Sequence, residues 1–433
     1  MRRVGFGCLT VWAGVAMAQG PPLSITLQDA VARAKQHAGQ LQAAGIAVQQ
    51  AREDRLQART LRLPTLNAFN QTIYTEGNGT PSGTFVSNDG VHVYNEQAQV
   101  HEEVLSIFRK GEVRRALATE AAARARVDIA ARGLNATVIQ NYYGIVGAQR
   151  RFSNAQLSLR DAEQFVDVTE KQEKGGEAAH SDVIKARLTL QQRQRDLQDA
   201  QVAIEKAKIA LGVLIFPNFN AEFTVADDAG AAELLPPVEE VRAKAEATSP
   251  DVKAARSSLD AAGYDVGVAR YGYLPSLSVD LFYGINANQF AIHGGRDPEE
   301  ANRRNLGYAA QVTLNVPVWN WGMTQSKIRQ AELRRSQAQL ELTLAGRALQ
   351  GNLATAMAEA RAALQQLDSL RSSVDLATES LRLTLLRYQA GEAVTLEVVD
   401  AQTTLAQSRN SYGDGLVRYR MAVANLQTLT GSL

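Results

Sequence analysis

The stretch GEAAHSDVIKARLTLQQRQRDLQDAQVAIEKAKIAL, residues 176–211, is restated without a gap by GEAVTLEVVDAQTTLAQSRNSYGDGLVRYRMAVANL, residues 391–426. Identical pairs include Gly176 and Gly391, Val183 and Val398, Leu190 and Leu405, and Leu211 and Leu426. Two shorter echoes lie upstream, residues 58–64 with 269–275 and residues 108–111 with 319–322. Self-similarity of this kind indicates two structural repeats, each of roughly 200 residues and therefore long enough to contain several helices and strands.

Residues 1–18 have the composition of a cleavable export signal. Two arginines precede a mostly apolar run at residues 4–16, and an Ala-Met-Ala triplet stands just before Gln19. We therefore expect the mature protein to begin at Gln19. The only cysteine, Cys8, lies within the signal, so the exported chain is expected to contain no disulfide and no cysteine ligand for a metal.

The mature chain has balanced charge, with 44 Lys and Arg against 45 Asp and Glu once the two arginines of the signal are removed. This balance gives no electrostatic case for nucleic acid as a partner. After residue 18, no segment approaches the roughly 18 to 20 consecutive apolar residues that a membrane helix needs. If the chain sits in a membrane, it must therefore do so as a β-barrel.

Long helices are predicted in the two tracts that contain no proline, residues 82–216 and 318–433. Both are rich in Ala, Gln, Leu, Arg and Glu, which favour helices. Apolar residues recur there at every seventh position: Val183, Leu190, Leu197, Ile204 and Leu211, and then Val398, Leu405, Tyr412, Tyr419 and Leu426. This period predicts left-handed coiled-coil packing, and the tracts alone favour an ordinary coiled coil. The predicted helix at 109–173 would be roughly 100 Å long.

Strands are predicted between the helical tracts. In the second repeat, apolar and polar residues alternate over residues 277–283 and 308–316, and the polar segment 286–304 between them is expected to form an exposed loop. The first repeat predicts matching strands at about 65–75 and 91–107. Their alternation is blurred by Gln97, Gln99, His101 and Glu102. The sequence thus predicts four strands per chain.

Four strands of about ten residues could cross a bilayer, but the smallest closed membrane barrels have about eight strands. One chain therefore cannot close its own barrel, whereas two or three copies would supply eight or twelve strands. Aromatic residues cluster at the predicted strand ends, as in interfacial aromatic belts: Tyr271, Tyr273, Tyr308, Trp319 and Trp321. The alternative is a small soluble sheet that covers the helix ends.

With these features in order, the whole mature chain resembles the outer-membrane efflux proteins, the TolC-like trimeric channels of Gram-negative envelopes. The resemblance is carried by the duplicated halves and by five local motifs: Leu-Pro at 63–64 and at 274–275, Val-Pro-Val-Trp at 316–319 with Gly322, and the turn-and-helix segments from Gly176 and from Gly391. It implies a mainly α-helical fold in which three chains share one twelve-stranded membrane β-barrel, four strands per chain. The barrel would continue into a trimeric α-helical tunnel across the periplasm.

The domain organisation predicted on this basis has four parts. Residues 1–18 form the signal, and residues 19–215 form the first repeat with its hairpin at about 65–107. Residues 216–237 form a linker at the waist of the tunnel. Residues 238–433 form the second repeat with its hairpin at about 276–317. The partners implied by the resemblance are two further copies of the chain, outer-membrane lipid, a periplasmic adaptor and an inner-membrane transporter.

An acidic pair is the first candidate for a functional site. Glu397 and Asp400 stand three residues apart at a predicted helix start, hence on nearly the same face, and they match the family's inward-facing acids near the tunnel entrance. In a trimer they would form a ring of six carboxylates that attracts cations and repels anions. From spacing alone, a solvated helix N-terminus, where acids are favoured, is the preferred explanation, and the resemblance favours the ring instead.

The resemblance also implies a gate and a docking site. Asp182 and Tyr388 match residues of the hydrogen-bonding network that holds the family's entrance shut, although ordinary helix packing explains Tyr388 equally well. The family pattern has an arginine where this chain has Ala393, so the gate is expected to be weaker or held differently. The hairpin tips that would meet the adaptor are Gly175, Gly176, Glu177, Ala390, Gly391 and Glu392. Glycines at helix turns are also common C-caps.

No feature of the sequence indicates an enzyme or a cofactor. The five histidines show no metal-ligand spacing, and no P-loop, dinucleotide fingerprint or nucleophile elbow is present. His180, Ser181 and Asp182 are neighbours at a helix start and do not face one another as a catalytic triad must. A passive export channel is therefore the favoured function. The alternatives are a periplasmic coiled-coil scaffold or adaptor without a membrane pore and, more weakly, a surface adhesin.

Overall fold

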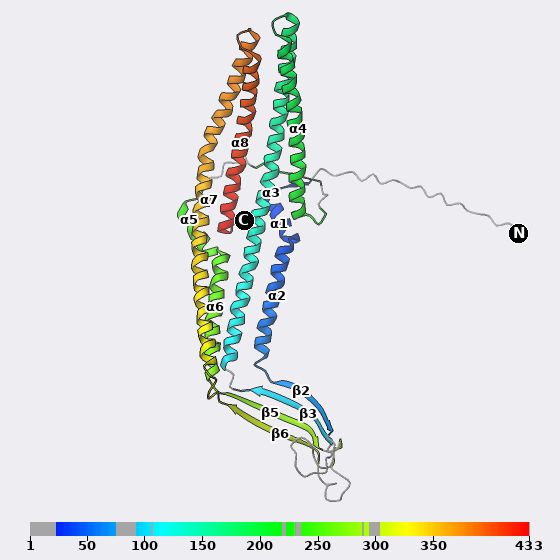
Figure 1. The fold of residues 1–433 in the computed structure, drawn as a ribbon, viewed down its shortest axis with the longest axis vertical. Coiled ribbons are helices and arrows are strands. Elements are labelled where there is room, and N and C mark those ends of the chain that lie inside the picture. The colour runs from blue at the N-terminus through cyan, green and yellow to red at the C-terminus, as the bar shows by residue number, and fades with distance from the viewer. Residues whose placement is uncertain are drawn as a thin grey trace, which may run out of the picture. The chain divides into compact units, whose positions relative to one another are not determined.

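The computed structural model describes residues 23–74, 92–104, 107–218, 222–228, 230, 235–287, 290–293 and 304–432. The predicted signal, the first hairpin loop and most of the 286–304 loop lie outside these residues. Figure 1 shows the order of the elements. The first repeat contains β1 (Leu23–Ile25), α1 (Leu27–His37), α2 (Gly39–Thr60), β2 (Thr65–Tyr74), β3 (His92–Glu103), α3 (Ile107–Gly175) and α4 (His180–Ile215).

The same order recurs in the second half of the chain: β4 (Phe223–Val225), α5 (Val238–Thr248), α6 (Pro250–Arg270), the 3-10 turn η1 (Tyr271–Tyr273), β5 (Ser276–Ala287), β6 (Leu306–Asn315), α7 (Met323–Gln389) and α8 (Thr395–Thr430). The four predicted strands and the long predicted helices are confirmed. No described helix is both long and apolar enough to cross a membrane.

The structure divides into two compact units, and these cut across the repeats. Unit 1 comprises Met1–Ala38, Gly133–Val238 and Thr355–Leu433, and unit 2 comprises Gly39–Arg132 and Glu239–Ala354. Because α3 and α7 are 69 and 67 residues long, each contributes to both units. Each repeat thus supplies half of each unit, and neither repeat folds into a body of its own.

Unit 2 contains an antiparallel sheet in the order β2-β3-β5-β6, so the two hairpins are joined where β3 pairs with β5. The register is regular along all three pairings, and His101 of β3 lies opposite Asp280 of β5. Side chains alternate between the faces of a strand. Residues Gln97, Gln99 and His101 therefore share one polar face with Asp280, and the blurred alternation of β3 comes from Glu96 and Glu102 on the other face.

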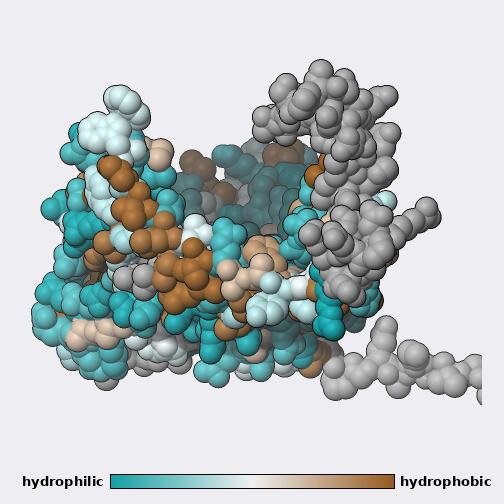
Figure 2. Space-filling model, turned by 90° about the horizontal axis from the view of Figure 1, so that it is seen from below, coloured by the Kyte–Doolittle hydropathy of each residue, from teal (hydrophilic) through white to brown (hydrophobic). Residues whose placement is uncertain are grey.

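The second face of the sheet is apolar and exposed. It carries large side chains from β2, β5 and β6, among them Leu66 (74% exposed), Leu281, Tyr283, Tyr308 (87% exposed), Val312 and Leu314. Figure 2 shows apolar side chains gathered in a band, with hydrophilic surface on both sides. Exposed apolar surface of this extent marks contact with a partner or a membrane. The outer edges of β2 and β6 pair with no other strand in the described part of the chain.

In unit 1, both repeats contribute to the core, and its main cluster consists mostly of residues from β1, α1, α3 and the end of α4. Val398, Leu405, Tyr419 and Leu426 of the predicted seven-residue pattern are all at most 3% exposed. The first repeat buries Val183 and Leu211 in the same way, but the middle of its pattern, at Leu190, Leu197 and Ile204, is only half-buried. On another side, α4 exposes an apolar stripe: Ile184, Leu188, Val202, Ile209 and Val213.

The predicted linker, residues 216–237, carries β4, which pairs in parallel with β1 in unit 1. Four contacts fix the chain after β4: Tyr142 Oη donates to the Ala226 carbonyl (2.9 Å), Tyr143 Oη to Asp228 (3.3 Å), Arg150 to both Asp227 oxygens (2.9 and 3.0 Å), and Arg420 to Asp228 (3.1 Å). Burial raises the pKa of Tyr143 to about 12. This phenol therefore remains a hydrogen-bond donor throughout the neutral range.

Candidate functional site at the hairpin turns

The turns from α3 to α4 and from α7 to α8 have the same backbone. In the first, Gly176 N–H donates to the Glu173 carbonyl (2.9 Å) and Glu177 N–H to the Gln172 carbonyl (2.8 Å). In the second, Gly391 donates to Tyr388 (3.0 Å) and Glu392 to Arg387 (2.8 Å). Both are Schellman motifs, whose C′ residue is left-handed. Gly176 (φ 80°) and Gly391 (φ 76°) occupy that position, where a side chain would be strained.

All six residues predicted to dock an adaptor are exposed on these turns: Gly175, Gly176, Glu177, Ala390, Gly391 and Glu392. The helices that follow begin without a polar N-cap side chain, at Ala179 and at Val394. The turn geometry thus explains the glycines, as expected for C-caps, and leaves both tips open to a partner. The docking role itself remains a prediction.

Both acids of the predicted entrance ring lie exposed in the first turns of α8. The Glu397 carboxylate accepts from the Val394 N–H (3.4 Å) and forms an ion pair with Arg387 (3.2 Å). Arg387 also donates to the Glu392 carbonyl (3.0 Å), so its guanidinium bridges the turn. The carboxylate of Asp400 has no partner among the residues that the structure describes. The sequence reasoning missed Arg387, although its position ten residues before Glu397 across a hairpin turn could have indicated the pair.

The two predicted gate residues form no hydrogen bond with each other in the part of the single chain that the structure describes. Tyr388 is 5% exposed, packs edge-on against Phe165 (ring centroids 5.3 Å apart), and its hydroxyl lies 3.4 Å from both Thr169 Oγ1 and Thr395 Oγ1. Asp182 is half-buried, and its carboxylate has no bonded partner in the described ranges. Helix packing therefore accounts for Tyr388 inside one chain, and a link between adjacent chains remains a prediction.

The first hairpin is held by exposed ion pairs instead. His180 Nδ1 lies 2.6 Å from a Glu173 carboxylate oxygen, and Arg187 donates to Glu170 (2.7 Å). His180 thus pairs with a residue of α3 and not with Ser181 or Asp182, as expected from the geometry of a helix start. Nothing in this arrangement resembles a catalytic triad.

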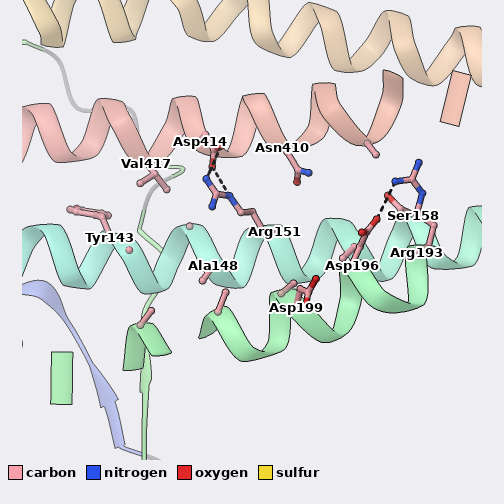
Figure 3. A pocket seen from close by; sticks show the side chains of 17 residues that line it. Tyr143, Ala148, Arg151, Ser158, Arg193, Asp196, Asp199, Asn410, Asp414 and Val417 are labelled. Atoms are coloured by element: carbon pink, nitrogen blue, oxygen red, sulfur yellow. Dashed lines mark hydrogen bonds and ion pairs between the residues drawn. The ribbon is translucent and has the colours of Figure 1, made fainter. Parts of the chain in front are cut away.

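A groove of about 580 Å³ lies in unit 1 where α3, α4 and α8 meet (Figure 3). Small residues line much of it: Gly144, Gly147, Ala148, Ala155, Ala200, Ala203, Ala207 and Ala406. Four of its charged residues form two ion pairs, Arg151 with Asp414 (3.0 Å) and Arg193 with Asp196 (3.3 Å), and Asp199 also lines it. Within the described ranges, no three His, Cys, Asp or Glu side chains are grouped so as to hold a metal ion. The small side chains allow the three helices to approach closely, and helix packing therefore explains the groove.

Comparison with known proteins gives a consistent answer. The family model described as outer membrane efflux protein matches residues 30–215 and 241–432, once in each repeat. The cobalt-zinc-cadmium resistance protein CzcC of Cupriavidus metallidurans is 27% identical over 69% of this chain and 68% of its own length. The cation efflux system protein CusC of Escherichia coli K12 is 26% identical over 86% of this chain and 79% of its own.

Solved structures show the same fold. A membrane protein from Pseudomonas aeruginosa superimposes with a TM-score of 0.82 at 22% identity, covering 94% of this chain and 93% of its own. The outer membrane protein VceC of Vibrio cholerae gives a TM-score of 0.80 at 18% identity, covering 94% and 96%. At such low identity, the agreement concerns the arrangement of helices and strands.

Proposed function

Because the chain belongs to the outer membrane efflux protein family, whose members are channels and not enzymes, we propose that three copies form the passive outer-membrane conduit of one tripartite exporter. The conduit would receive its substrate from a periplasmic adaptor and an inner-membrane pump. Transport energy would come from the pump, since the chain has no nucleotide-binding motif. The family places the barrel in the outer membrane and the helical tunnel in the periplasm.

The sheet is the observation that carries this proposal. Its four strands have one polar face and one exposed apolar face, and both outer edges are unpaired in the described chain. A polar lumen, an apolar lipid face and edges that need further strands are the properties of one segment of a shared barrel. A periplasmic scaffold or adaptor would have no use for so large an exposed apolar face.

For the entrance, we propose that Glu397 and Asp400 of three chains form the acidic ring, with Arg387 as a third member. The ion pair between Arg387 and Glu397 offsets one of the two negative charges per chain. Asp400, which has no partner in the described structure, would then dominate the attraction of cations. The ring is supported by the exposure of both acids on the first turns of α8.

For closure, we propose that the half-buried Asp182 and the turn around Tyr388 meet across adjacent chains. Support comes from the free carboxylate of Asp182, which a donor on a neighbouring chain could satisfy. A hydrogen bond to a charged group contributes about 1.5 to 3 kcal/mol. Ala393 has no donor side chain, whereas Arg387 already donates to the Glu392 carbonyl within the same turn.

For assembly, we propose that the adaptor contacts the two exposed tips, Gly175–Gly176–Glu177 and Ala390–Gly391–Glu392. Each tip presents glycine or alanine backbone next to one glutamate, which suits close helix-to-helix contact with a basic or polar partner. The relatives named above concern cobalt, zinc and cadmium resistance in one case and cation efflux in the other. Another relative, from Pseudomonas putida, is named for pyoverdine export, so the proposed substrate specificity belongs to the pump and not to the conduit.

The test is conductance of the mature protein in planar bilayers, beside a Glu397→Ala, Asp400→Ala double variant. We expect discrete, cation-selective steps from the wild type and weaker selectivity from the double variant, because the acidic ring is gone. Arg387→Gln is the matched control at the same turn. It removes a positive charge, so it should increase cation selectivity.

Each outcome decides a separate part of the proposal. Steps whose selectivity is unchanged in all variants would keep the channel but refute the entrance ring. Absence of steps from the wild type, despite confirmed insertion as a trimer, would contradict an open conduit. Recovery of the protein in a salt-soluble periplasmic fraction would favour the scaffold.

A further inference from the structure

We propose that His101 and Asp280 of three chains form a pH-dependent ring of charge inside the shared barrel, and that this ring contributes to the ion selectivity of the conduit. The inference rests on the proposed function, since a ring requires three chains around one pore. It assigns a role in ion selectivity to the sheet of unit 2. The proposed entrance ring lies on α8, in unit 1.

The register of the sheet places both residues on its polar face. His101 lies directly opposite Asp280, and the same face continues through Thr65 and Asn67 on β2 and through Gln311 and Thr313 on β6. Most of the exposed apolar side chains lie on the opposite face, although Phe69 and Ile73 of β2 share the face of His101. In a membrane barrel, the apolar face contacts lipid and the polar face lines the lumen. His101 and Asp280 therefore belong to the lumen.

The two side chains form a direct contact. His101 Nδ1 lies 2.6 Å from Asp280 Oδ1, and Gln99 Nε2 donates to the same oxygen at 3.0 Å. With Nδ1–H as donor, the second ring nitrogen of His101 is free to take up a proton. The histidine side chain is 39% exposed and that of Asp280 is 12% exposed. Water can therefore exchange protons with the imidazole while the carboxylate stays fixed.

Few other charges face this pair. On the polar face of the described strands, the ionisable residues are His101, Asp280 and Glu103. Glu103 forms an ion pair with Arg109 of α3 (2.5 Å), and the residue opposite His101 on β2 is the neutral Thr65. Among the described residues, Asp280 is thus the one carboxylate of this face that is bonded to a histidine.

The charge of the ring follows from the protonation of His101. With a neutral imidazole, each chain contributes one negative charge, whereas an imidazolium cancels the carboxylate. Histidine makes this change between about pH 5 and pH 8. A ring of carboxylates favours cations, so cation selectivity should fall on acidification. The effect should be strongest in dilute salt, because the Debye length grows from about 8 Å at 0.15 M to about 30 Å at 0.01 M.

The test is the reversal potential across a KCl gradient centred near 0.01 M, at pH 8 and at pH 5. The protein carries the Glu397→Ala and Asp400→Ala substitutions, so that entrance carboxylates do not contribute. In this background, we expect the cation-to-anion permeability ratio to fall about twofold or more at pH 5. With His101→Gln, the ratio should stay high at both pH values. With Asp280→Asn, it should already be low at pH 8 and should fall further at pH 5, because the charge of the imidazolium is then not cancelled.

Glu102→Gln is the matched control, since it removes a charge from the next position of β3 on the opposite face of the sheet. It should behave like the background protein. A ratio that does not change with pH, or a change that persists in His101→Gln, overturns the ring and leaves the conduit intact. If Asp280→Asn does not assemble, the comparison of the pH response between the background protein and the His101→Gln variant tests the proposal by itself. Absence of steps from the unmodified protein contradicts the proposed function instead.

Discussion

The two hairpin turns share a backbone and differ in the chemistry that holds them. Residues 215 positions apart are equivalent, so Glu173 and His180 of the first hairpin correspond to Tyr388 and Thr395 of the second. The first pair forms an ion pair at the surface (2.6 Å). The second pair is buried, with the tyrosine hydroxyl 3.4 Å from the threonine. One geometry thus accommodates either an exposed or a buried contact.

A second equivalent pair shows the same difference. Arg187 donates to Glu170 in the first hairpin, and both side chains are at least one-third exposed. Their counterparts are Leu385, which packs against the core around Val398, and Gln402, which is 5% exposed and donates to the Asp161 carbonyl. Backbone signals such as the left-handed glycine fix where a helix ends. Burial by neighbouring helices then decides which side chains each copy can use.

The largest expected effect is at Tyr388, which should depend on its buried position. Truncation of a buried aromatic side chain costs about 3 to 5 kcal/mol, so Tyr388→Ala should sharply lower the temperature at which the detergent-solubilised trimer dissociates. The equivalent Glu173→Ala removes a partly exposed partner, worth about 0 to 1 kcal/mol. Melting followed by circular dichroism and by gel mobility measures both. Equal losses would show that the two hairpins are equally buried in the assembly.

An intermediate effect is expected at the glycines, where the two hairpins should behave alike. Gly176→Ala and Gly391→Ala each place a Cβ atom at a positive φ, which costs roughly 1 to 2 kcal/mol. Nothing lies within 4 Å of the added Cβ at either position, so strain alone should set the cost. The same melting measurement applies, with Gly144→Ala as a helical control in open space. A large difference between the two variants would contradict the shared turn geometry.

The smallest effect is expected for the exposed ion pair of the first hairpin. A double-mutant cycle with Glu170→Gln and Arg187→Gln should give a coupling energy of about 0.2 to 1 kcal/mol, and salt should reduce it further. The cycle is read from melting in dilute and in concentrated salt. A coupling that salt leaves unchanged would mean that a neighbouring chain buries this pair, and the contrast between the hairpins would then be smaller than in the single chain.

Local sequence signals predicted the elements well. Period-two alternation located β5 and β6, the absence of proline located α3 and α7, and Gly176 and Gly391 located both turns. Contacts between distant residues could not be read in this way. Arg420 and Asp228 are 192 positions apart, and their pairing depends on how α8 packs against the segment after β4. The same holds for His101 and Asp280, which meet only because β3 of one repeat pairs with β5 of the other.

The proposed entrance ring contains a difference that spacing alone does not predict. The spacing of Glu397 and Asp400 in the sequence predicts two equivalent negative charges. The structure separates them, because Arg387 neutralises only Glu397. The duplicated sequence likewise predicts two repeats, residues 19–215 and 238–433, and each compact unit combines parts of both. Because α3 and α7 run through both units, the boundary between the repeats is not a boundary between the compact units.

The unpaired outer edges of β2 and β6 have a consequence for biogenesis and genetics. Unsatisfied backbone groups cost several kcal/mol each in hydrocarbon, so a lone chain cannot rest in the bilayer with two open edges. Insertion and trimer formation must therefore be coupled, and the periplasm must hold unassembled chains whose edges are prone to pair wrongly. A variant chain whose β2 or β6 edge cannot pair would prevent closure of every barrel that contains it. Such an allele should therefore be dominant over a wild-type copy in the same cell.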